Sequence, residues 1–450
     1  MIILFWEKLQ EAAKKFKQEI KDRHVRIFSQ FDTDGITSAA IMVKTLLRLE
    51  KNFELKIFKQ LNRFTVEEIK PNKGDILIFL DFGSGQLNLL KDFFETNLVF
   101  VLDHHEPLII EHENLFHLNP RLYGESEYSS SIVSYWFSRS IDSKNADLVD
   151  LAILGAIGDE QDEKWEFKGE MKKLVEEGVS LGRISVIKDL RIYGRNSRPL
   201  YKALAYTFDP YIPGISGSEA QAVQFLKEIG IEPMKGDKWR KLSDLTPEEK
   251  RKLASAIIYE RLREEEAEDI FGEVYILLNR PENFQDAREL STLINACSRM
   301  GYSDIAIRLA LNDNSVFEKV FEIVESYKKK ISQGLSMIGD GLIEETENAI
   351  YILAGKKIPE ELIGTIVSIY SNSINSKKPV FGLAETDRYI KVSGRTNKDI
   401  NLRDLLVKVV EKIGGEAGGH AKAAGAYIDK GKEQEFIKAV EAVINGEKEG

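Results

Sequence analysis

Two short, wholly apolar segments most constrain the fold of this chain. Residues 76–80 read Ile-Leu-Ile-Phe-Leu, and residues 98–102 read Leu-Val-Phe-Val-Leu. Strands that are apolar on both faces are typical of a parallel sheet covered by helices on both sides. Two more strands are expected, at residues 25–28 and 55–60. Helices are expected at residues 6–21, 35–49, 130–139 and 146–157. This alternation predicts an α/β domain with a parallel sheet and right-handed crossovers.

The pattern changes twice along the remainder of the chain. Residues 164–335 are expected to be mostly helical, with one strand at 274–278 and an acidic run at 264–269. Strands then return at residues 349–353, 380–384 and 389–393, with helices at 360–373 and 402–413. A Gly/Ala-rich loop, a strand at 426–428 and a terminal helix complete the chain. We therefore expect three parts: residues 1–182, residues 183–340 as a connecting helix with an α-rich insertion, and residues 341–450 as a smaller α/β domain.

Composition excludes several classes of protein. The 450 residues contain no run near the roughly 20 apolar residues that a membrane span needs, and Glu7 ends the short apolar start. A single cysteine rules out an internal disulfide framework and suits a reducing cytoplasm. Abundant Lys, Glu and Arg are typical of heat-adapted proteins. The net charge of −10 argues against a generally basic nucleic-acid coat but allows a local basic groove.

Acidic and histidine residues directly follow the expected strands. Residues 32–35 (Asp-Thr-Asp-Gly) follow the first strand region, Asp81 follows 76–80, and residues 103–105 (Asp-His-His) follow 98–102. Asp159 adds a carboxylate after an apolar helix. Because the carboxyl ends of parallel strands meet at one edge of a sheet, we expect these side chains to converge there.

Each motif also has a simpler structural interpretation. Asp34 and Gly35 can form a turn, Asp32 can cap the next helix, and Asp81 can belong to an ordinary loop. Two adjacent histidines after an apolar strand are hard to explain in that way, so a metal site is favoured. Carboxylates with histidine suit Mn²⁺ or Mg²⁺ better than structural Zn²⁺. Two such ions stabilise the attacking and leaving oxygens of phosphoryl transfer, which predicts phosphoester or phosphoanhydride hydrolysis.

The motifs resemble those of a known family. Their order, Asp-x-Asp-Gly, Asp, Asp-His-His and Gly-Asp, is similar to that of the DHH phosphoesterase superfamily. Residues 418–425 (Gly-Gly-His-Ala-Lys-Ala-Ala-Gly) resemble the signature of its associated C-terminal domain. The insertion and residues 193–200 (Tyr-Gly-Arg-Asn-Ser-Arg-Pro-Leu) resemble the archaeal RecJ-like branch, which includes the GINS-associated nuclease. The resemblance covers nearly the whole chain and makes residues 1–182 the catalytic domain and 341–450 the substrate-binding domain.

The resemblance also implies roles for single residues. Asp32 would bind the first metal and Asp34 the second, Asp81 would bridge both, His104 and Asp159 would complete the second site, and His105 would contact the scissile phosphate. Asp34, Asp81 and His105 are thereby the expected catalytic residues.

Two further residues are expected behind these ligands. Asp103 would orient one histidine ring. Gln30 departs from the family pattern, because many relatives have His or Asp two residues before the position of Asp32. An amide oxygen is a weaker, neutral ligand, so we expect the first metal to be held loosely or with the help of water.

Two groups of residues are expected to bind substrate. Gly418 and Gly419 would let a phosphate approach main-chain N–H groups, with His420 and Arg395 as further donors. A tight turn and an ordinary surface arginine are the simpler alternatives. Residues 183–202 hold six basic residues and one acid, with two tyrosines between them. This composition suits a single-strand channel, with Tyr193, Arg195 and Arg198 as contacts, but also a solvated linker helix.

Our leading hypothesis is a Mn²⁺- or Mg²⁺-dependent exonuclease that acts on single-stranded nucleic acid. By resemblance it would cut DNA 5′→3′ in replication or repair, in an archaeal cytoplasm, together with GINS and the replicative helicase. The choice between DNA and RNA stays open. The alternatives are a hydrolase of short oligonucleotides or cyclic dinucleotides, a catalytically weak replisome scaffold bound to GINS and, more distantly, a pyrophosphatase.

Overall fold

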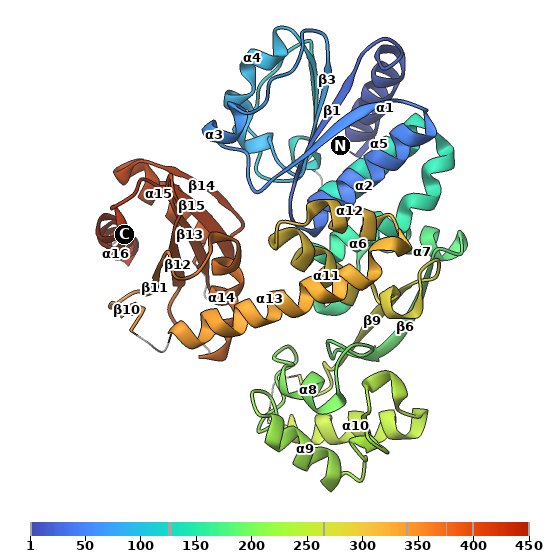
Figure 1. Ribbon diagram of the computed structural model, residues 1–450, viewed down its shortest axis with the longest axis vertical. Coiled ribbons are helices and arrows are strands. Elements are labelled where there is room, and N and C mark those ends of the chain that lie inside the picture. The colour runs from blue at the N-terminus through green and yellow to red at the C-terminus, as the bar shows by residue number, and fades with distance from the viewer. Residues whose placement is uncertain are drawn as a thin grey trace. The chain divides into compact units, whose positions relative to one another are not determined.

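The computed structural model describes residues 2–124, 128–263, 266–338, 341–374, 376–397 and 400–448. Glu264 and Glu265 of the expected acidic run lie outside these residues. The chain divides into two compact units, Met1–Val320 and Phe321–Gly450, whose elements are labelled in Figure 1. Within the described residues, no helix is both long and apolar enough to cross a membrane.

The first unit is built on the expected parallel sheet. Its order is β2-β1-β3-β4-β5, and every neighbouring pair is parallel. The strands are β1 (Val25–Gln30), β2 (Phe53–Phe58), β3 (Ile76–Leu80), β4 (Leu98–Leu102) and β5 (Leu115–Leu118). Both apolar segments form fully buried strands, β3 and β4, near the centre of the sheet. Strand β5 was not expected, because it is only four residues long and mostly half-buried.

Helices cover both faces of this sheet. One face packs against longer helices, and the Phe16 ring meets the Phe100 ring edge-on at 5.4 Å between centroids. The other face carries an aromatic cluster in which Phe28 stacks on Phe79 at 5.1 Å. The helices of this region are α1 (Ile2–Glu19), α2 (Thr33–Arg48), α3 (Arg63–Val66), α4 (Lys91–Phe94), α5 (Ser130–Ile141) and α6 (Val149–Gly158).

The prediction of a connecting helix from residue 183 is wrong, because this segment forms a strand. Strand β6 (Ile184–Leu190) pairs with β9 (Phe271–Leu277) in antiparallel fashion. Apolar and polar residues alternate only loosely in β6, so the sequence lacks a clear strand period. Between these strands lies a helical insertion with its own apolar core. The other elements of this region are α7 (Gly169–Ser180), α8 (Leu200–Ala205), α9 (Glu219–Glu228), β7 (Met234–Lys235), β8 (Lys238–Trp239), α10 (Pro247–Glu260), α11 (Ala287–Arg299) and α12 (Ser303–Ala310).

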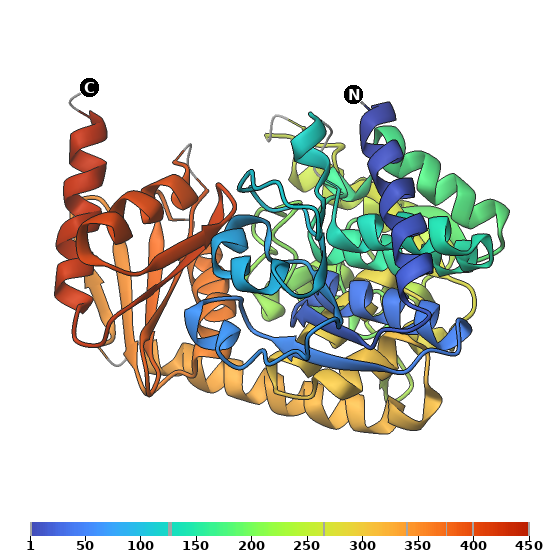
Figure 2. The same ribbon diagram turned by 90° about the horizontal axis from the view of Figure 1, so that it is seen from above.

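The second unit holds a mixed sheet in the order β10-β11-β12-β13-β15-β14. Only β11 and β12 pair in parallel, among the strands that the structure describes in this sheet. Helices α15 and α16 pack on one face and α14 on the other (Figure 2). The elements are α13 (Phe317–Ile338), which enters from the first unit, then β10 (Ile343–Glu345), β11 (Ile350–Gly355), α14 (Glu360–Ser373), β12 (Val380–Glu385), β13 (Ile390–Arg395), α15 (Leu402–Ile413), β14 (Glu416–Gly419), β15 (Ala423–Ile428) and α16 (Glu433–Lys448).

The prediction of a Gly/Ala-rich loop before the last strand is also wrong, because part of this segment forms β14 and pairs with β15. Small residues carry little strand propensity, so the pairing depends on the neighbouring strands and not on the segment itself. Short 3₁₀ helices complete the fold: η1 (Ser84–Leu89), η2 (Pro120–Tyr123), η3 (Ser143–Leu148), η4 (Glu163–Trp165), η5 (Leu242–Asp244), η6 (Glu282–Phe284) and η7 (Asn314–Val316).

Gly35 lets the first turn of α2 lie against the end of β1. A Cβ atom at Gly35 would lie 2.3 Å from the carbonyl oxygen of Gln30 and 2.9 Å from its Cα. Gly35 is helical, so its role is this close approach and not the tight bend that the sequence suggested. The approach fixes where the residues at the start of α2 lie relative to the sheet.

Replacing Gly35 with alanine should therefore lower the free energy of unfolding by about 2–4 kcal/mol, because backbone and not a flexible side chain must move. Urea denaturation of the full chain measures this change. Gly446→Ala, also in a helix but with open space around its Cβ position, is the matched control and should leave stability unchanged or slightly higher. Equal stability of Gly35→Ala and the wild type would contradict the packing argument.

Candidate metal centre

Asp32 lies at the start of α2, where it caps the helix. One carboxylate oxygen, Oδ1, accepts a hydrogen bond from the backbone N–H of Gly35 at 3.0 Å. The N-cap interpretation therefore describes the structure. A carboxylate has two oxygens with several acceptor positions, so capping alone does not remove Asp32 from a metal site.

Asp34 is buried and is held by the N-terminus of α5. Its Oδ2 accepts a hydrogen bond from the backbone N–H of Ser130 at 2.7 Å, and its Oδ1 accepts one from Ser131 at 3.0 Å. A helix N-terminus offers both unpaired N–H groups and a favourable dipole to an anion. These two hydrogen bonds fix the carboxylate of Asp34 in one orientation.

Asp81 follows β3 in a strained, buried conformation. Its φ of 64° is in the left-handed region, and its backbone N–H donates to the carbonyl of Leu102 at 3.0 Å. Such a backbone costs on the order of 1–3 kcal/mol in a residue other than glycine. Burial, together with the negative charges of Asp32 and Asp34, raises the pKa of Asp81 well above its ordinary value.

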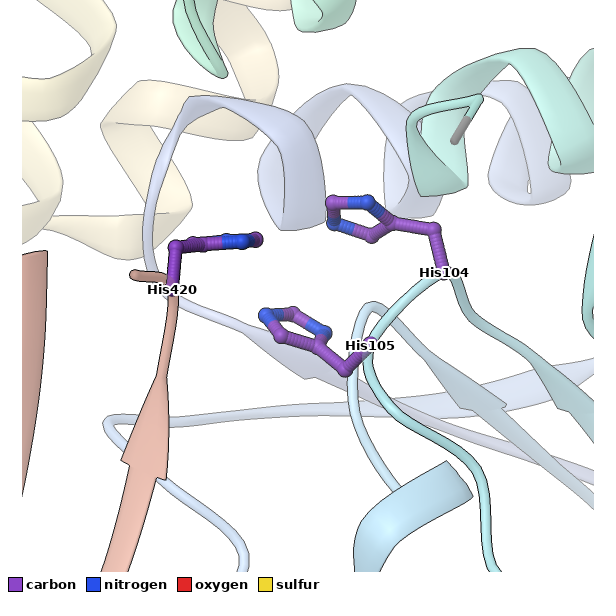
Figure 3. Close-up of side chains that lie close together, drawn as sticks. All are labelled: His104, His105 and His420. Atoms are coloured by element: carbon purple, nitrogen blue, oxygen red, sulfur yellow. The ribbon is translucent and has the colours of Figure 1, made fainter. Parts of the chain in front are cut away.

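The Asp103-His104-His105 turn, whose two histidine side chains are drawn in Figure 3, follows β4. The buried Asp103 carboxylate organises this turn. Its Oδ1 accepts hydrogen bonds from the backbone N–H groups of His104 at 2.8 Å and His105 at 3.2 Å, and lies 2.7 Å from His105 Nδ1. Burial opposes ionisation of Asp103, but the charge and the hydrogen bond of His105 hold its pKa well below the ordinary value. The two imidazole rings lie 4.5 Å apart between centroids.

These side chains converge on His104. Its Nε2 lies 3.5 Å from Asp81 Oδ1, 3.5 Å from Asp159 Oδ2 and 3.9 Å from Asp34 Oδ2. Asp34, Asp81 and His104 each offer one ligand atom within 4.8 Å of the others, and all three are buried. The structure thus brings together four of the five residues expected to bind metal, with Asp32 two residues from Asp34.

The donor set fits a divalent cation. Asp81 Oδ1 is a buried carboxylate oxygen that, within the described residues, accepts no hydrogen bond. An isolated buried carboxylate is costly, and a cation would satisfy it together with the neighbouring Asp34. Two carboxylates and an imidazole are hard and intermediate ligands, which suit Mn²⁺ or Mg²⁺.

A second group of polar residues, which the sequence did not single out, supports the Asp-His-His turn. The backbone N–H of Ser84 donates to Asp103 Oδ2 at 2.8 Å, and Ser84 Oγ lies 2.7 Å from His117 Nε2. Asn119 Nδ2 donates to Ser84 Oγ at 2.9 Å and to the carbonyl of His105 at 2.7 Å. Burial lowers the pKa of His117 to about 4, so its ring is neutral near pH 7. Only the scarcity of histidine in the sequence could have drawn attention to His117.

Gln30 contacts Asp81. With its amide nitrogen turned toward that residue, Gln30 donates hydrogen bonds to the Asp81 carbonyl at 2.8 Å and to Asp81 Oδ2 at 3.0 Å. An –NH₂ group in this orientation holds the carboxylate and cannot itself bind a cation. The structure therefore places Gln30 behind Asp81, where it supports the strained ligand.

Residues 183–202 do not form one open basic track. Arg183 pairs with Asp150 at 3.0 Å, Arg191 with Asp209 and Asp269 at 2.6 and 2.9 Å, and Arg195 with Asp189 at 3.0 Å. The partners come from distant parts of the sequence, except for Asp189, so the sequence could not show this neutralisation. Tyr193 is half-buried, and burial raises its pKa to about 12.

The expected phosphate-binding residues of the second unit lie at one end of its sheet. Gly418 and Gly419 end β14, and His420 lies at the turn into β15, where its N–H donates to Ala423 at 2.9 Å. Arg395, at the end of β13, is the register partner of Ala423. Gly419 has a φ of 118°, so it serves the turn, whereas a Cβ at Gly418 would meet open space. Arg395 and His420 therefore lie near each other in this unit.

Replacing Gln30 with leucine should lower the affinity for Mn²⁺ by about tenfold or more, because residues that orient metal ligands contribute about 10- to 100-fold to affinity. Electron paramagnetic resonance of free Mn²⁺ measures this binding without any substrate. Gln10→Leu, at an exposed position of α1, is the control and should bind Mn²⁺ like the wild type. Unchanged affinity in Gln30→Leu would mean that Asp81 needs no support from this amide.

Comparison with known proteins gives three consecutive domain matches. Residues 24–157 match the DHH family N-terminal domain, residues 192–271 the DHH-CID domain, and residues 346–446 the DHHA1 domain. An uncharacterised protein of Methanocaldococcus jannaschii, MJ0831, is 33% identical over 454 residues, which cover 97% of this chain and 98% of the relative.

Solved structures share the fold. RecJ of Thermus thermophilus in complex with Mn²⁺ has a TM-score of 0.60 at 20% identity, and the match covers 97% of this chain but only 54% of RecJ. CDC45 of Entamoeba histolytica has a TM-score of 0.69 at 13% identity, and the match covers 98% and 99% of the two chains. The three domain matches, together with the relative that matches over nearly the full length, show that the chain belongs to the DHH family, with a DHH-CID domain and a C-terminal DHHA1 domain.

Proposed function

We propose that this protein is a Mn²⁺- or Mg²⁺-dependent exonuclease that hydrolyses phosphodiester bonds in single-stranded nucleic acid, with DNA degraded from its 5′ end. The observation that carries the proposal is the buried cluster of Asp34, Asp81 and His104. A DHH phosphoesterase fold with these groups intact supports phosphoester hydrolysis. The single-strand preference, the polarity and a second metal ion go beyond that fold.

The residues of the first unit divide the chemistry between them. Asp34, Asp81, His104 and Asp159 would hold one ion, and Asp32 with Asp81 a second. Bound ions of this kind stabilise developing charge on the attacking and leaving oxygens. His105 is oriented through Nδ1 by Asp103, and its ring would contact the scissile phosphate. Asp103 and Gln30 act as positioning residues.

The second unit would bind the strand. Arg395 can bind a phosphate bidentately, and the open space beside Gly418 permits close approach of a phosphate to the main chain. We accordingly assign residues 1–182 as the catalytic domain and 341–450 as the substrate-binding domain, with residues 183–340, which contain the insertion, between them. The Mn²⁺ complex of the RecJ structure supports the choice of metal.

Two alternatives differ in measurable ways. A hydrolase of short oligonucleotides or cyclic dinucleotides would cleave dinucleotides faster than a 30-mer, whereas the proposed exonuclease favours the longer strand. A catalytically weak scaffold is suggested by the similarity in fold to CDC45. The retention of buried Asp34, Asp81 and His104 argues against it, because unsatisfied buried polar groups destabilise a protein that makes no use of them. Association with GINS and the replicative helicase stays a proposal from family resemblance.

Replacing Asp34 with alanine should reduce cleavage of a 5′-labelled single-stranded DNA by at least about 10³-fold while leaving strand binding within about threefold, because Asp34 holds metal and not the strand. EDTA should have the same effect on the wild type. Gel analysis of 5′- and 3′-labelled strands, with Mn²⁺ or Mg²⁺, measures cleavage and direction together.

Asp92→Ala is the matched control, an exposed aspartate on α4 outside the site, and should cleave like the wild type. Cleavage that persists in Asp34→Ala or in EDTA would overturn the metal-dependent proposal. Binding without any cleavage by the wild type, with both metals tested, would favour the scaffold.

A further inference from the structure

The insertion exposes a group of aromatic rings on one small surface. Tyr201 of α8 and Trp239 of β8 lie 4.5 Å apart between ring centroids at an interplanar angle of 49°. Trp239 is 41% exposed, and Tyr206, which follows α8, is 53% exposed. Both rings are therefore accessible to solvent, although the insertion has an apolar core of its own.

Cations lie over and beside these rings. The guanidinium of Arg198 lies 5.8 Å from the centroid of the Tyr206 ring, and Lys202 Nζ lies 5.9 Å from that of Tyr201. Lys235 and Lys238 are exposed on the β7–β8 hairpin that carries Trp239. We call these rings and cations the stacking surface: Arg198, Tyr201, Lys202, Tyr206, Lys235, Lys238 and Trp239.

The cations of the stacking surface differ from the three arginines that flank β6. Arg183, Arg191 and Arg195 are each neutralised by an aspartate. Arg198, Lys202, Lys235 and Lys238 form no ion pair within the described part of the chain. The four cations outnumber the two acids beside the rings, which are Glu219, an acceptor of a hydrogen bond from the Tyr206 hydroxyl at 2.8 Å, and Asp237 of the hairpin. On a protein with a net charge of −10, this surface is therefore locally positive.

We propose that the stacking surface binds single-stranded nucleic acid, with bases stacked on Tyr206 and Trp239 and phosphates paired with Arg198 and Lys202. This inference rests on the proposed function and locates a second contact for its substrate. Open aromatic faces bind unpaired bases, while the bases of a duplex are already stacked on one another and hidden. Unpaired cations beside the rings match the phosphates that connect successive bases.

The test uses the full-length chain with Asp34→Ala and EDTA, so that no strand is cleaved. Fluorescence anisotropy with a labelled 20-nucleotide oligothymidine measures the Kd of this protein. The same measurement is made on a double variant that carries Tyr206→Leu and Trp239→Leu together. Loss of base stacking should raise Kd about tenfold or more. Tyr259→Leu replaces a tyrosine of the same insertion that is 71% exposed and lies outside the stacking surface, and it should change Kd less than twofold.

Two further readouts make the outcome decisive. Trp239 fluorescence should be quenched by the oligothymidine, and this quenching should be absent in Trp239→Leu. Thermal unfolding checks that the double variant and Trp239→Leu remain folded. Equal Kd values for the double variant and Tyr259→Leu, or equally tight binding of duplex DNA or of an acidic polypeptide, would overturn the inference. Because the measurement needs no cleavage, an inactive wild type would contradict the proposed function and leave this inference standing.

Discussion

The arrangement of the site depends on the hydrogen bonds that the start of α5 gives to Asp34. Two backbone N–H groups, of Ser130 and Ser131, hold both carboxylate oxygens. This interaction joins α2 to α5 across nearly a hundred residues of sequence and sets a buried negative charge at the end of the sheet. A helix N-terminus compensates an anion without a positively charged partner, so the carboxylate remains available to a cation.

Close packing of helices holds this geometry in place. A Cβ at Gly155 would lie 2.2 Å from Ser131 Oγ, and one at Gly158 would lie 2.6 Å from Thr33 Cβ. Thr33 also donates a hydrogen bond to the carbonyl of Ser291, at 2.9 Å, so α11 supports the turn that carries the two aspartates. Residues that follow the insertion thus help to hold the site in place.

The sequence predicted the parallel sheet well because β3 and β4 are continuously apolar and each ends at an acidic motif. It also predicted which residues converge, since the ends of parallel strands share one edge of a sheet. The sequence did not predict features that depend on tertiary contacts. Strand β6 pairs with a strand some 80 residues later, and Arg183 and Arg191 form ion pairs with aspartates that are not their neighbours in sequence. The support from Ser84, His117 and Asn119 was equally hidden, because ordinary polar residues have no pattern of their own.

The central claim is that the Asp34, Asp81 and His104 cluster exists to hold divalent cations. Anomalous diffraction from a crystal of the full chain soaked in Mn²⁺ tests it most directly. An anomalous peak bonded to carboxylate oxygens of Asp34 and Asp81 and to a ring nitrogen of His104 is the expected result. A map without a peak at these side chains, at saturating Mn²⁺ and with their arrangement unchanged, would contradict it.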